Sequence, residues 1–412
     1  MASLPTQVER IEITGFRSLK EIAWEPGRLN VIIGRNGSGK SNLLWALELL
    51  QESARGKLRE RVLAEGGIRQ LLWDNRAPGI GWKVKLRLAS PRESRSLTYE
   101  LQVRPKGVEG GHYVAHELLA DYRRVESGEK LEPFKYLERN PGHTVIWDSE
   151  KQKLVPLTKL EPSSEQENEQ ASSLPEDETV LSELIPYGDI WTLLFARGLL
   201  RFRIAHDLET GRRAAVREAA VSRVERTLVP DGQNLIPVLH TLYTGNREFK
   251  RSIDSAMRTA FENDFEELVF APAADQKVQM RVRWKSLTEP ISAANLSDGT
   301  LRFLMLLTAL ANPDLGSLVA IDEPETGLHP RMFPIIAEFA ASASERTSVI
   351  LTTHSPQLLD AFPSDCVPTI TVAECVEGET KLSILPPDEL KRWLTEYGFG
   401  SAFKSGALET LA

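Results

Sequence analysis

The clearest fold signal in the chain is GRNGSGKS, from Gly34 to Ser41. It follows the apolar run RLNVII and precedes the periodic run NLLWALELL, so the pattern predicts a strand, a glycine-rich loop and a helix. Gly34, Gly37 and Gly39 let backbone amides approach phosphate oxygens with no Cβ in the way, and the dipole of the following helix favours an anion. Lys40 would reach the β- and γ-phosphates of a nucleotide, and Ser41 would ligate magnesium. The alternative is a glycine turn of accidental composition, which the flanking strand and helix disfavour.

A second motif, SLVAIDEPETGLHP (317–330), supplies acids at the end of an apolar strand. We expect Asp322 to hold the magnesium shell and Glu323 to polarise the attacking water as a general base. A pair of neighbouring acids is common by itself. Its place after a buried strand, in a chain that has a phosphate loop, favours the catalytic interpretation.

A third motif, VILTTHSPQLL (349–359), repeats this arrangement one strand later. His354 follows an apolar strand, so we expect it at the carboxyl edge of the sheet, where ligands bind in open α/β folds. A lone histidine is more often a surface or core residue. Here its position favours a contact with the γ-phosphate.

The stretch NLSDGTLRF (295–303) reads as a helix start with Ser297 as N-cap. An ordinary N-cap is the simplest interpretation of this stretch alone. A second exposed helix N-terminus is redundant beside a phosphate loop in one subunit, but it would suit a nucleotide held by another subunit. Gly299 would allow close approach, Ser297 would donate a hydrogen bond, and the helix dipole would favour the γ-phosphate.

The remaining pattern predicts an α/β fold in three segments. Residues 1–180 would form the first part of the core, with the phosphate loop and antiparallel strands such as WKVKLRLA (82–89). Residues 181–264 would form an inserted helical lobe, including the run RAAVREAAVSRVERTL (213–228), and residues 265–412 the second part of the core, ending in a hairpin and a helix. The acidic, polar stretch within 160–196 predicts a solvated loop.

Composition narrows the function classes. The chain of 412 residues has a net charge of -8, so any contact with nucleic acid must come from a local patch. It has two cysteines and no long apolar run, and its first residues lack an apolar targeting core. We therefore expect a soluble, cytoplasmic protein with no membrane partner.

The motifs occur in the order seen in ABC-type ATPases, and the chain resembles the RecF, SMC and OLD group, in particular compact RecF-like predicted AAA family ATPases. The resemblance implies an ABC-ATPase-type P-loop NTPase head that uses ATP and Mg²⁺ and dimerises head to head around ATP. It implies that Ser297, Asp298 and Gly299 act in trans. It also places Arg17, in ITGFRSLKEI (13–22), near the nucleotide. The implied nucleotide-binding residues of the loop are Gly34, Arg35, Asn36, Gly37, Ser38, Gly39, Lys40, Ser41 and Asn42.

The chain also departs from the group's pattern. Asp298 stands where many ABC proteins have glycine, so its side chain should point away from the γ-phosphate, and Thr300 replaces the usual glutamine. His329 stands where an aspartate that contacts the partner is common. Gln70 and Gln170 are weak candidates for the Q-loop glutamine. About fifty residues follow TTHSP, which is too few for the Toprim nuclease domain of OLD proteins, so any nuclease would be a separate chain.

Two functions fit these observations. The first is an ATP-hydrolysing switch in DNA repair or genome maintenance, as the resemblance implies. The second is an ATPase that senses or restrains a separate effector, such as a nuclease or toxin in phage defence, which suits an acidic chain. DNA contact would use the arginine cluster of the helical lobe, although nearby acids make a mixed solvated face an equal alternative. The cluster consists of Arg197, Arg201, Arg203, Arg212, Arg213, Arg217, Arg223 and Arg226.

Overall fold

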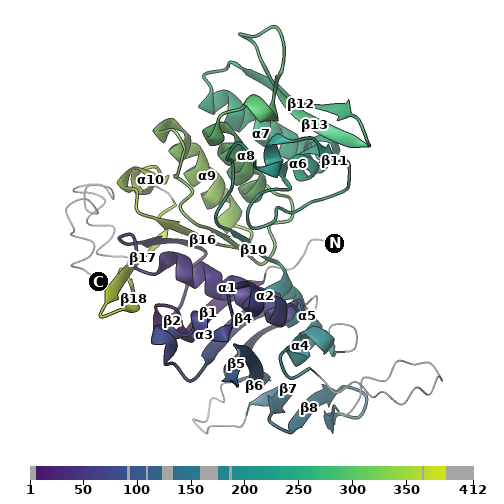
Figure 1. Ribbon diagram of the computed structural model, residues 1–412, viewed down its shortest axis with the longest axis vertical. Helices are drawn as coiled ribbons and strands as arrows, with labels where there is room; N and C mark the ends of the chain where they lie inside the picture. Colours follow the sequence, from purple (N-terminus) through teal and green to yellow (C-terminus); the bar gives the residue numbers. More distant parts are fainter. Residues whose placement is uncertain are drawn as a thin grey trace, which may run out of the picture. The chain divides into compact units, whose positions relative to one another are not determined.

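The computed structural model describes residues 6–90, 93–107, 110–122, 133–157, 175–184, 188–363 and 366–386 (Figure 1). These residues belong to two compact units. Unit 1 draws on 1–26, 37–202 and 374–382, and unit 2 on 27–36, 203–373 and 383–412. The chain passes from unit 2 to unit 1 within the phosphate loop, between Asn36 and Gly37. The three-segment division expected from the sequence stays a prediction.

Unit 1 is built on an eight-stranded antiparallel sheet with the order β2-β1-β4-β5-β6-β7-β8-β9. Buried positions alternate with mostly half-buried ones along β4, as expected for a sheet with one more deeply covered face. The antiparallel strands predicted after the phosphate loop are thus confirmed. The strands are β1 (Gln7–Phe16), β2 (Leu19–Trp24), β4 (Ile80–Ala89), β5 (Ser94–Lys106), β6 (Gly111–Asp121), β7 (Phe134–Asn140), β8 (His143–Asp148) and β9 (Lys153–Pro156).

Helices cover this sheet and are joined to it by buried polar contacts. The indole of Trp82, on β4, donates to the carbonyl of Ala46 at 3.0 Å. Glu117, on β6, is completely buried and accepts from the amides of Val180 and Leu181 and from the hydroxyl of Tyr99. It thereby fixes the start of α4. The helices are α1 (Lys40–Ala54), α2 (Leu58–Ala64), α3 (Ile68–Leu71), α4 (Val180–Leu184) and α5 (Ile190–Leu200).

The second sheet has six strands in the order β10-β15-β16-β3-β17-β18, and its central strands are parallel. Every residue of β3, β15 and β16 is buried, as their largely apolar sequences predict. Helices α8 (Asp298–Leu310) and α9 (Phe333–Ser344) belong to the same α/β layer. The strands are β3 (Leu29–Ile33), β10 (Phe202–Ala205), β15 (Leu318–Ile321), β16 (Ser348–Thr353), β17 (Thr369–Val376) and β18 (Glu379–Ile384).

The rest of unit 2 contains α6 (Leu235–Gly245), α7 (Arg247–Ala260), α10 (Pro356–Asp360) and a small sheet. Helices α5, α6 and α7 form where the sequence of 181–264 predicts helices, but α5 belongs to unit 1 and the other two to unit 2. The helix predicted over 213–228 is wrong, because this run forms a 3-10 turn, η2 (Ala215–Arg217), a short strand, β11 (Ala220–Val221), and irregular chain. Its apolar residues are buried at Ala214 and Val216 but exposed at Val224, which is not the period of a helix. The small sheet also has β12 (Phe265–Ala273), β13 (Lys277–Trp284) and β14 (Ile291–Ser292).

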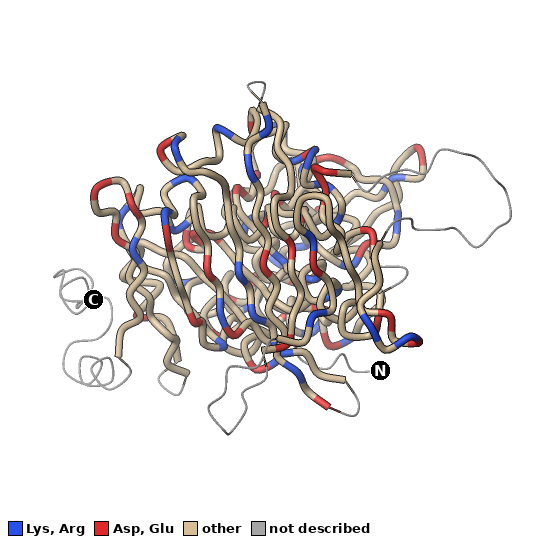
Figure 2. Tube along the Cα trace, turned by 90° about the horizontal axis from the view of Figure 1, so that it is seen from below, with Lys and Arg blue, Asp and Glu red and all other residues tan. Residues whose placement is uncertain are grey.

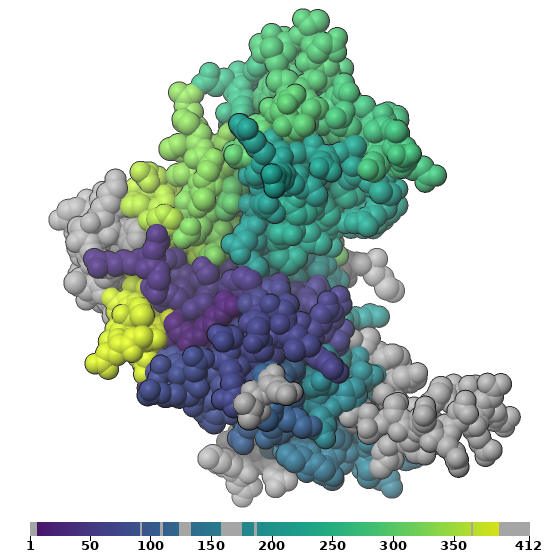
Figure 3. All heavy atoms as spheres, in the orientation of Figure 1, coloured from purple at the N-terminus to yellow at the C-terminus, as the bar shows by residue number. Residues whose placement is uncertain are grey.

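The end of the described chain returns to the beginning. The predicted hairpin is β17 and β18, and β18 lies against the N-terminal segment at Ser18, where Thr380 donates its amide to the Ser18 carbonyl at 2.8 Å (Figure 3). The predicted C-terminal helix and the acidic run 158–174 lie outside the described residues. Among the described helices, none has the length and apolar character to cross a membrane.

Candidate functional site

Three parallel strands of the second sheet end at one edge, and a motif follows each of them. Strands β15, β16 and β3 are adjacent and parallel. Asp322 follows β15, His354 follows β16 and Gly34 follows β3, so all three leave the sheet at the same edge. The sequence predicted this convergence, and within unit 2 the structure brings these residues together.

The two acids are joined through Thr352, which sequence reasoning did not identify. The Thr352 hydroxyl donates to Oδ1 of Asp322 and accepts from the amide of Glu323 at 3.1 Å. Glu323 has a φ of +42°, a conformation that is uncommon for a residue with a side chain. Its Oε1 lies 3.0 Å from Nδ1 of His354, and its Oε2 accepts from Thr326 at 3.3 Å. The Glu323 carboxylate thus faces the His354 imidazole.

Glu325 supports His354 from the interior. Its Oε1 accepts from the hydroxyl of Thr353 and from the amide of His354 at 3.2 Å. Its Oε2 is buried and makes no hydrogen bond within the described part of the chain. Burial raises the pKa of Glu325, while these donors and the nearby His354 oppose that shift. The sequence offered no signal for this role beyond a second acid in DEPE.

The phosphate loop has the backbone that its glycines predict. Gly37 and Gly39 have φ values of +82° and +93°. A Cβ on Gly39 would lie 1.9 Å from Oγ1 of Thr380, so glycine is required there for space as well as for conformation. Thr380 supports the loop by donating its hydroxyl to the carbonyl of Ser38 at 3.0 Å, and its Oγ1 lies 2.7 Å from Oγ of Ser18. The sequence did not indicate that Thr380 and Ser18 support the loop. Thr380 lies 342 positions after Ser38, so no local pattern connects the two.

The loop residues of unit 1 fit a bound phosphate. Lys40 is buried, with 4% of its surface exposed, at the first turn of α1. The hydroxyl of Ser38 is buried and finds no partner among the residues described. Asn42 donates to Ser18 at 2.8 Å, which ties α1 to the loop's support. A buried cation, an orphaned hydroxyl and a glycine-lined turn are suited to an anion.

Arg17 lies in unit 1 and is engaged by other groups. Its Nη2 donates to Oε2 of Glu65 at 2.8 Å, and its Cζ lies over the Trp45 ring, 4.9 Å from the ring centroid. Its backbone φ is +46°, and its amide donates to the carbonyl of Leu71. A nucleotide contact by Arg17 stays a prediction, whereas its neighbour Ser18 already touches the loop's support.

The stretch around Ser297 forms the start of α8. Ser297 is the N-cap, and its Oγ accepts from the amide of Thr300 at 3.1 Å. The hydroxyl of Thr300 lies 2.8 Å from the same atom. A Cβ on Gly299 would lie 2.7 Å from the carbonyl oxygen of Gly327, so this glycine has a packing role within its own subunit. A role in trans for Ser297 and Gly299 is untested by these contacts.

Asp298 is paired within the same unit. Arg217 donates to Oδ1 of Asp298 at 2.5 Å and to the carbonyl of Leu296 at 2.7 Å. Only 10% of the Arg217 side chain is exposed, against 69% of Asp298. The acid that departs from the ABC pattern is therefore compensated by an arginine that holds the approach to α8.

Of the remaining sequence candidates, the structure places His329 and Gln70. His329 caps η4 (Pro330–Met332) by accepting from the amide of Arg331 at 3.2 Å. Gln70 is an exposed residue of α3, and Gln170 lies outside the described residues. None of these observations assigns a Q-loop glutamine.

The predicted arginine cluster does not form one helix face. Arg197 and Arg201 fall in unit 1 and the other members in unit 2. Arg217 donates to the carbonyl of Leu296 just before α8, and Arg223 forms an ion pair with Glu225. Figure 2 shows Lys and Arg interspersed with Asp and Glu along the trace. The cluster thus includes a largely buried arginine and one paired with an acid, and its contact with nucleic acid stays a prediction.

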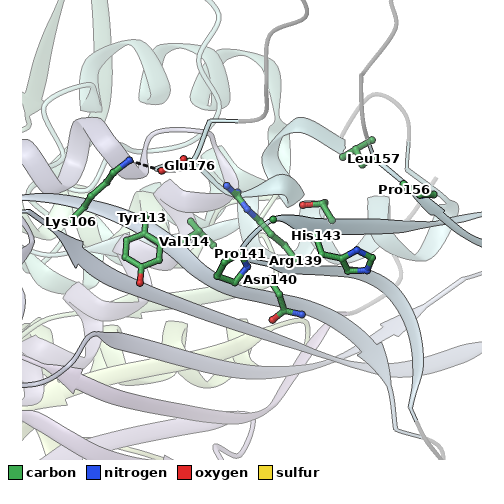
Figure 4. Close-up of a pocket in the computed structure, with 12 residues that line it drawn as sticks. Lys106, Tyr113, Val114, Arg139, Asn140, Pro141, His143, Pro156, Leu157 and Glu176 are labelled. Atoms are coloured by element: carbon green, nitrogen blue, oxygen red, sulfur yellow. Dashed lines mark hydrogen bonds and ion pairs between the residues drawn. The ribbon is translucent and has the colours of Figure 1, made fainter.

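Unit 1 also contains a cavity of about 550 Å³ at the turn between β7 and β8 (Figure 4). Lys106 and Glu176 form an ion pair at 2.5 Å on its wall. Arg139, which is buried, donates to the carbonyls of Glu178 and Pro175. None of the predicted site residues lines this cavity, and Arg139 has a structural role there.

Comparison with protein families identifies the chain. Residues 29–360 match the family described as "AAA domain, putative AbiEii toxin, Type IV TA system". The chain belongs to this family. The matched residues include the phosphate loop, the start of α8, the two acids and His354.

Curated and solved proteins extend the likeness to SMC heads. A stretch of 57 residues is 40% identical to Structural maintenance of chromosomes protein 3 of Caenorhabditis elegans, which is 13% of this chain and only 4% of that protein. The fold is similar to an SMC head solved with the C-winged helix domain of ScpA, with a TM-score of 0.56, 12% identity, and 94% of this chain and 99% of that chain covered. An SMC head from Pyrococcus furiosus, solved with the C-terminal domain of ScpA, gives a TM-score of 0.51, 14% identity and coverage of 95% and 99%. The fold is therefore the α/β fold of SMC heads.

Proposed function

We propose that the chain binds ATP with Mg²⁺ and hydrolyses it. The observation that carries the proposal is the edge of the second sheet, where Asp322, Glu323 and His354 leave adjacent strands and Glu323 lies 3.0 Å from His354. The phosphate-loop backbone, with its buried Lys40, supports it independently. Membership of an AAA family supports nucleotide binding.

Each residue has a distinct role in this proposal. The loop amides from Gly34 to Gly39 and the ammonium of Lys40 bind the β- and γ-oxygens. Ser41 and Asp322 would hold a magnesium ion, which would supply positive charge to the phosphate oxygens. The Thr352 hydroxyl keeps the Asp322 carboxylate in one orientation.

Glu323 is the proposed general base. A carboxylate accepts a proton from the attacking water, and the hydrogen bond to His354 limits the directions in which Glu323 can point. In the tautomer that carries the proton on Nδ1, His354 donates to Oε1 of Glu323 and so orients the base. The Glu325 contacts to Thr353 and the His354 amide keep the imidazole in place.

The proposed working form is a head-to-head homodimer, or a higher oligomer built from it, closed around ATP. Ser297 and Gly299 would face the γ-phosphate held by the partner, with the dipole of α8 favouring the anion. The pairing of Asp298 with Arg217 supports this assignment, because it offsets the one negative side chain at that helix start.

Two candidate functions differ in the molecule on which the proposed ATPase acts. A switch in DNA repair or genome maintenance is favoured by the SMC-head fold. A regulatory ATPase acting with a separate toxin or nuclease effector is favoured by the toxin and Type IV TA wording of the family description. ATPase rates with and without duplex and single-stranded DNA separate them. Stimulation that declines with salt favours the first, and an unchanged rate with no DNA binding at low salt favours the second.

Lys40→Ala tests the nucleotide site directly. Removing the ammonium takes away the loop's positive charge on the β- and γ-oxygens, so tight binding of ATP should be lost while the fold is retained. Isothermal titration calorimetry with ATP and Mg²⁺ measures the affinity, and Lys57→Ala, at an exposed position after α1, is the matched control. A folded Lys40→Ala protein with wild-type affinity would refute the proposal.

A further inference from the structure

Arg302 connects the helix that begins at Ser297 with the turn that carries Glu323. It lies in the second turn of α8, and its Nη2 donates to the backbone carbonyl of Glu323 at 3.1 Å. Its Nη1 donates to the carbonyl of Leu208 at 3.3 Å. The guanidinium therefore links α8 to two separate stretches of backbone.

The same turn touches α8 at a second point. The amide of Thr326 donates to the carbonyl of Glu323 at 3.1 Å and closes the turn. Farther along, the Gly327 carbonyl lies so near Gly299 that a Cβ there would be 2.7 Å away. The first two turns of α8 thus hold both ends of the segment 323–327, so a displacement of α8 must move this segment with it.

The half-buried Arg302 lies among acids that only partly offset the cost of its burial. Burial lowers the pKa of Arg302, and attraction by Glu325, and more weakly by Glu323, Asp322 and Asp207, opposes that shift. Nε of Arg302 is buried and unbonded among the described residues, as is Oε2 of Glu325. A partly buried charge with an unsatisfied donor costs free energy. The two carbonyl contacts of the guanidinium are therefore made at a cost to stability.

We propose that Arg302 is a positioning residue for Glu323, and that through it the position of α8 sets the orientation of the proposed general base. The inference rests on the proposed ATP hydrolysis. Glu323 has a left-handed φ, which persists only where surrounding contacts hold it. The Arg302 bond to its carbonyl is one of those contacts. An ATP-bound partner that presses on the start of α8 would then also align Glu323.

The planar fork of arginine is essential to this role. Two carbonyls on different segments are reached by Nη1 and Nη2 of one rigid group. Lysine carries the same charge on a single nitrogen and has no such geometry. Arg302→Lys should therefore keep the charge and lose much of the positioning, whereas Arg302→Gln should lose both.

The test uses the full chain and three measurements. For Arg302→Gln we expect the affinity for a non-hydrolysable ATP analogue with Mg²⁺ to stay within about twofold of wild type, and kcat to fall about tenfold or more. Amide hydrogen exchange across 321–328, without nucleotide, should become faster. Arg258→Gln is the matched control, because Arg258 also donates to a backbone carbonyl of unit 2, that of Glu266 at 3.3 Å, and it should change none of the three.

A double-variant comparison separates positioning from general damage. If Arg302 acts through Glu323, adding Arg302→Gln to Glu323→Gln should slow hydrolysis no further. If the losses in kcat of the two single variants multiply in the double variant, the proposal is overturned. It is also overturned if Arg302→Gln has the kcat and the amide hydrogen exchange of wild type. Should Arg302→Gln fail to fold, Arg302→Lys takes its place with the same expectations and the same outcomes against it.

The exchange measurement distinguishes failure of this inference from failure of the proposed function. If wild type binds ATP but does not hydrolyse it, the proposed hydrolysis fails. Faster exchange across 321–328 in Arg302→Gln then still supports the positioning contact, and unchanged exchange overturns it. Hydrolysis by wild type with no effect of Arg302→Gln on kcat or exchange overturns this inference alone.

Discussion

Arg217 places its guanidinium 2.5 Å from the carboxylate of Asp298, at the start of α8. The same side chain donates to the carbonyls of Ala294 and Leu296 at 3.2 and 2.7 Å. Arg217 therefore orders the approach to the helix and compensates the acid that the ABC pattern does not have. An acid in a first helical turn is favourable for the helix, but by itself it would oppose an approaching phosphate.

We expect Arg217→Met to destabilise the protein by about 1.5–3 kcal/mol, because backbone carbonyls lose a charged donor. Asp298→Asn removes only the ion pair, which is largely exposed on the Asp298 side, and should cost less than about 1 kcal/mol. Urea unfolding of both variants measures the difference. Arg223→Met, at an exposed arginine that also pairs with an acid, is the matched control. Equal losses for Arg217→Met and Asp298→Asn would show that the ion pair, not the carbonyl contacts, stabilises this region.

Glu323→Gln should retain ATP binding and slow hydrolysis about a hundred- to ten-thousandfold, since the amide cannot accept the proton of the attacking water. Single-turnover hydrolysis and calorimetric affinity separate the two effects. The control is Glu338→Gln, which makes the same change at an exposed position of α9. Wild-type turnover by Glu323→Gln would mean that another residue activates the water.

The sequence predicts the parts of this site that lie next to each other along the chain. The phosphate loop, the strand before Asp322 and the strand before His354 all carry local patterns, and parallel pairing then brings their ends to one edge. Thr380, Arg302 and Arg217 have no such pattern, because each acts on a segment far away in sequence. The alanines and arginines of the run 213–228 favour a helix, so its sequence predicts one. The run instead forms a 3-10 turn and irregular chain, because its apolar residues Ala214 and Val216 pack into the core of unit 2.

Glu117 gives a prediction about pH. Burial raises its pKa above the ordinary 4.5, against the opposing effects of two amides, the Tyr99 hydroxyl and Arg139. A carboxyl with a raised folded-state pKa stabilises the fold fully below 4.5, and this contribution is lost as the pH rises through the higher value. Wild type should therefore lose stability relative to Glu117→Gln as the pH rises from 4.5, because glutamine has no charge to bury. Urea unfolding of both proteins from acid to neutral pH measures this. If the free energy of unfolding of wild type instead rises relative to that of Glu117→Gln with rising pH, the hydrogen-bond donors to Glu117 outweigh the effect of burial on its pKa.

Ser297→Arg tests whether the start of α8 acts in trans. A bulky cation should block close approach of the second subunit, so ATP-dependent dimers and hydrolysis should disappear while monomer affinity for ATP is retained. The substitution also removes the N-cap bond to Thr300, which is worth about 1 kcal/mol. Ser297→Ala removes the cap alone and is the matched control. Gly299→Ala is unsuitable, because its Cβ would collide with Gly327 within the same subunit.

Mixing Ser297→Arg with Lys40→Ala gives the sharper result. In a mixed dimer one composite site combines both defects. The other combines the intact phosphate loop of the Ser297→Arg chain with the intact helix start of the Lys40→Ala chain. Random assortment of equal amounts leaves about a quarter of all sites intact, so hydrolysis should return to roughly that fraction of wild type if one good site closes the dimer. Neither protein alone should hydrolyse ATP. Activity of Ser297→Arg by itself at the wild-type rate, or no recovery in mixtures shown by cross-linking to contain mixed dimers, would leave Ser297 as an N-cap with no role in trans.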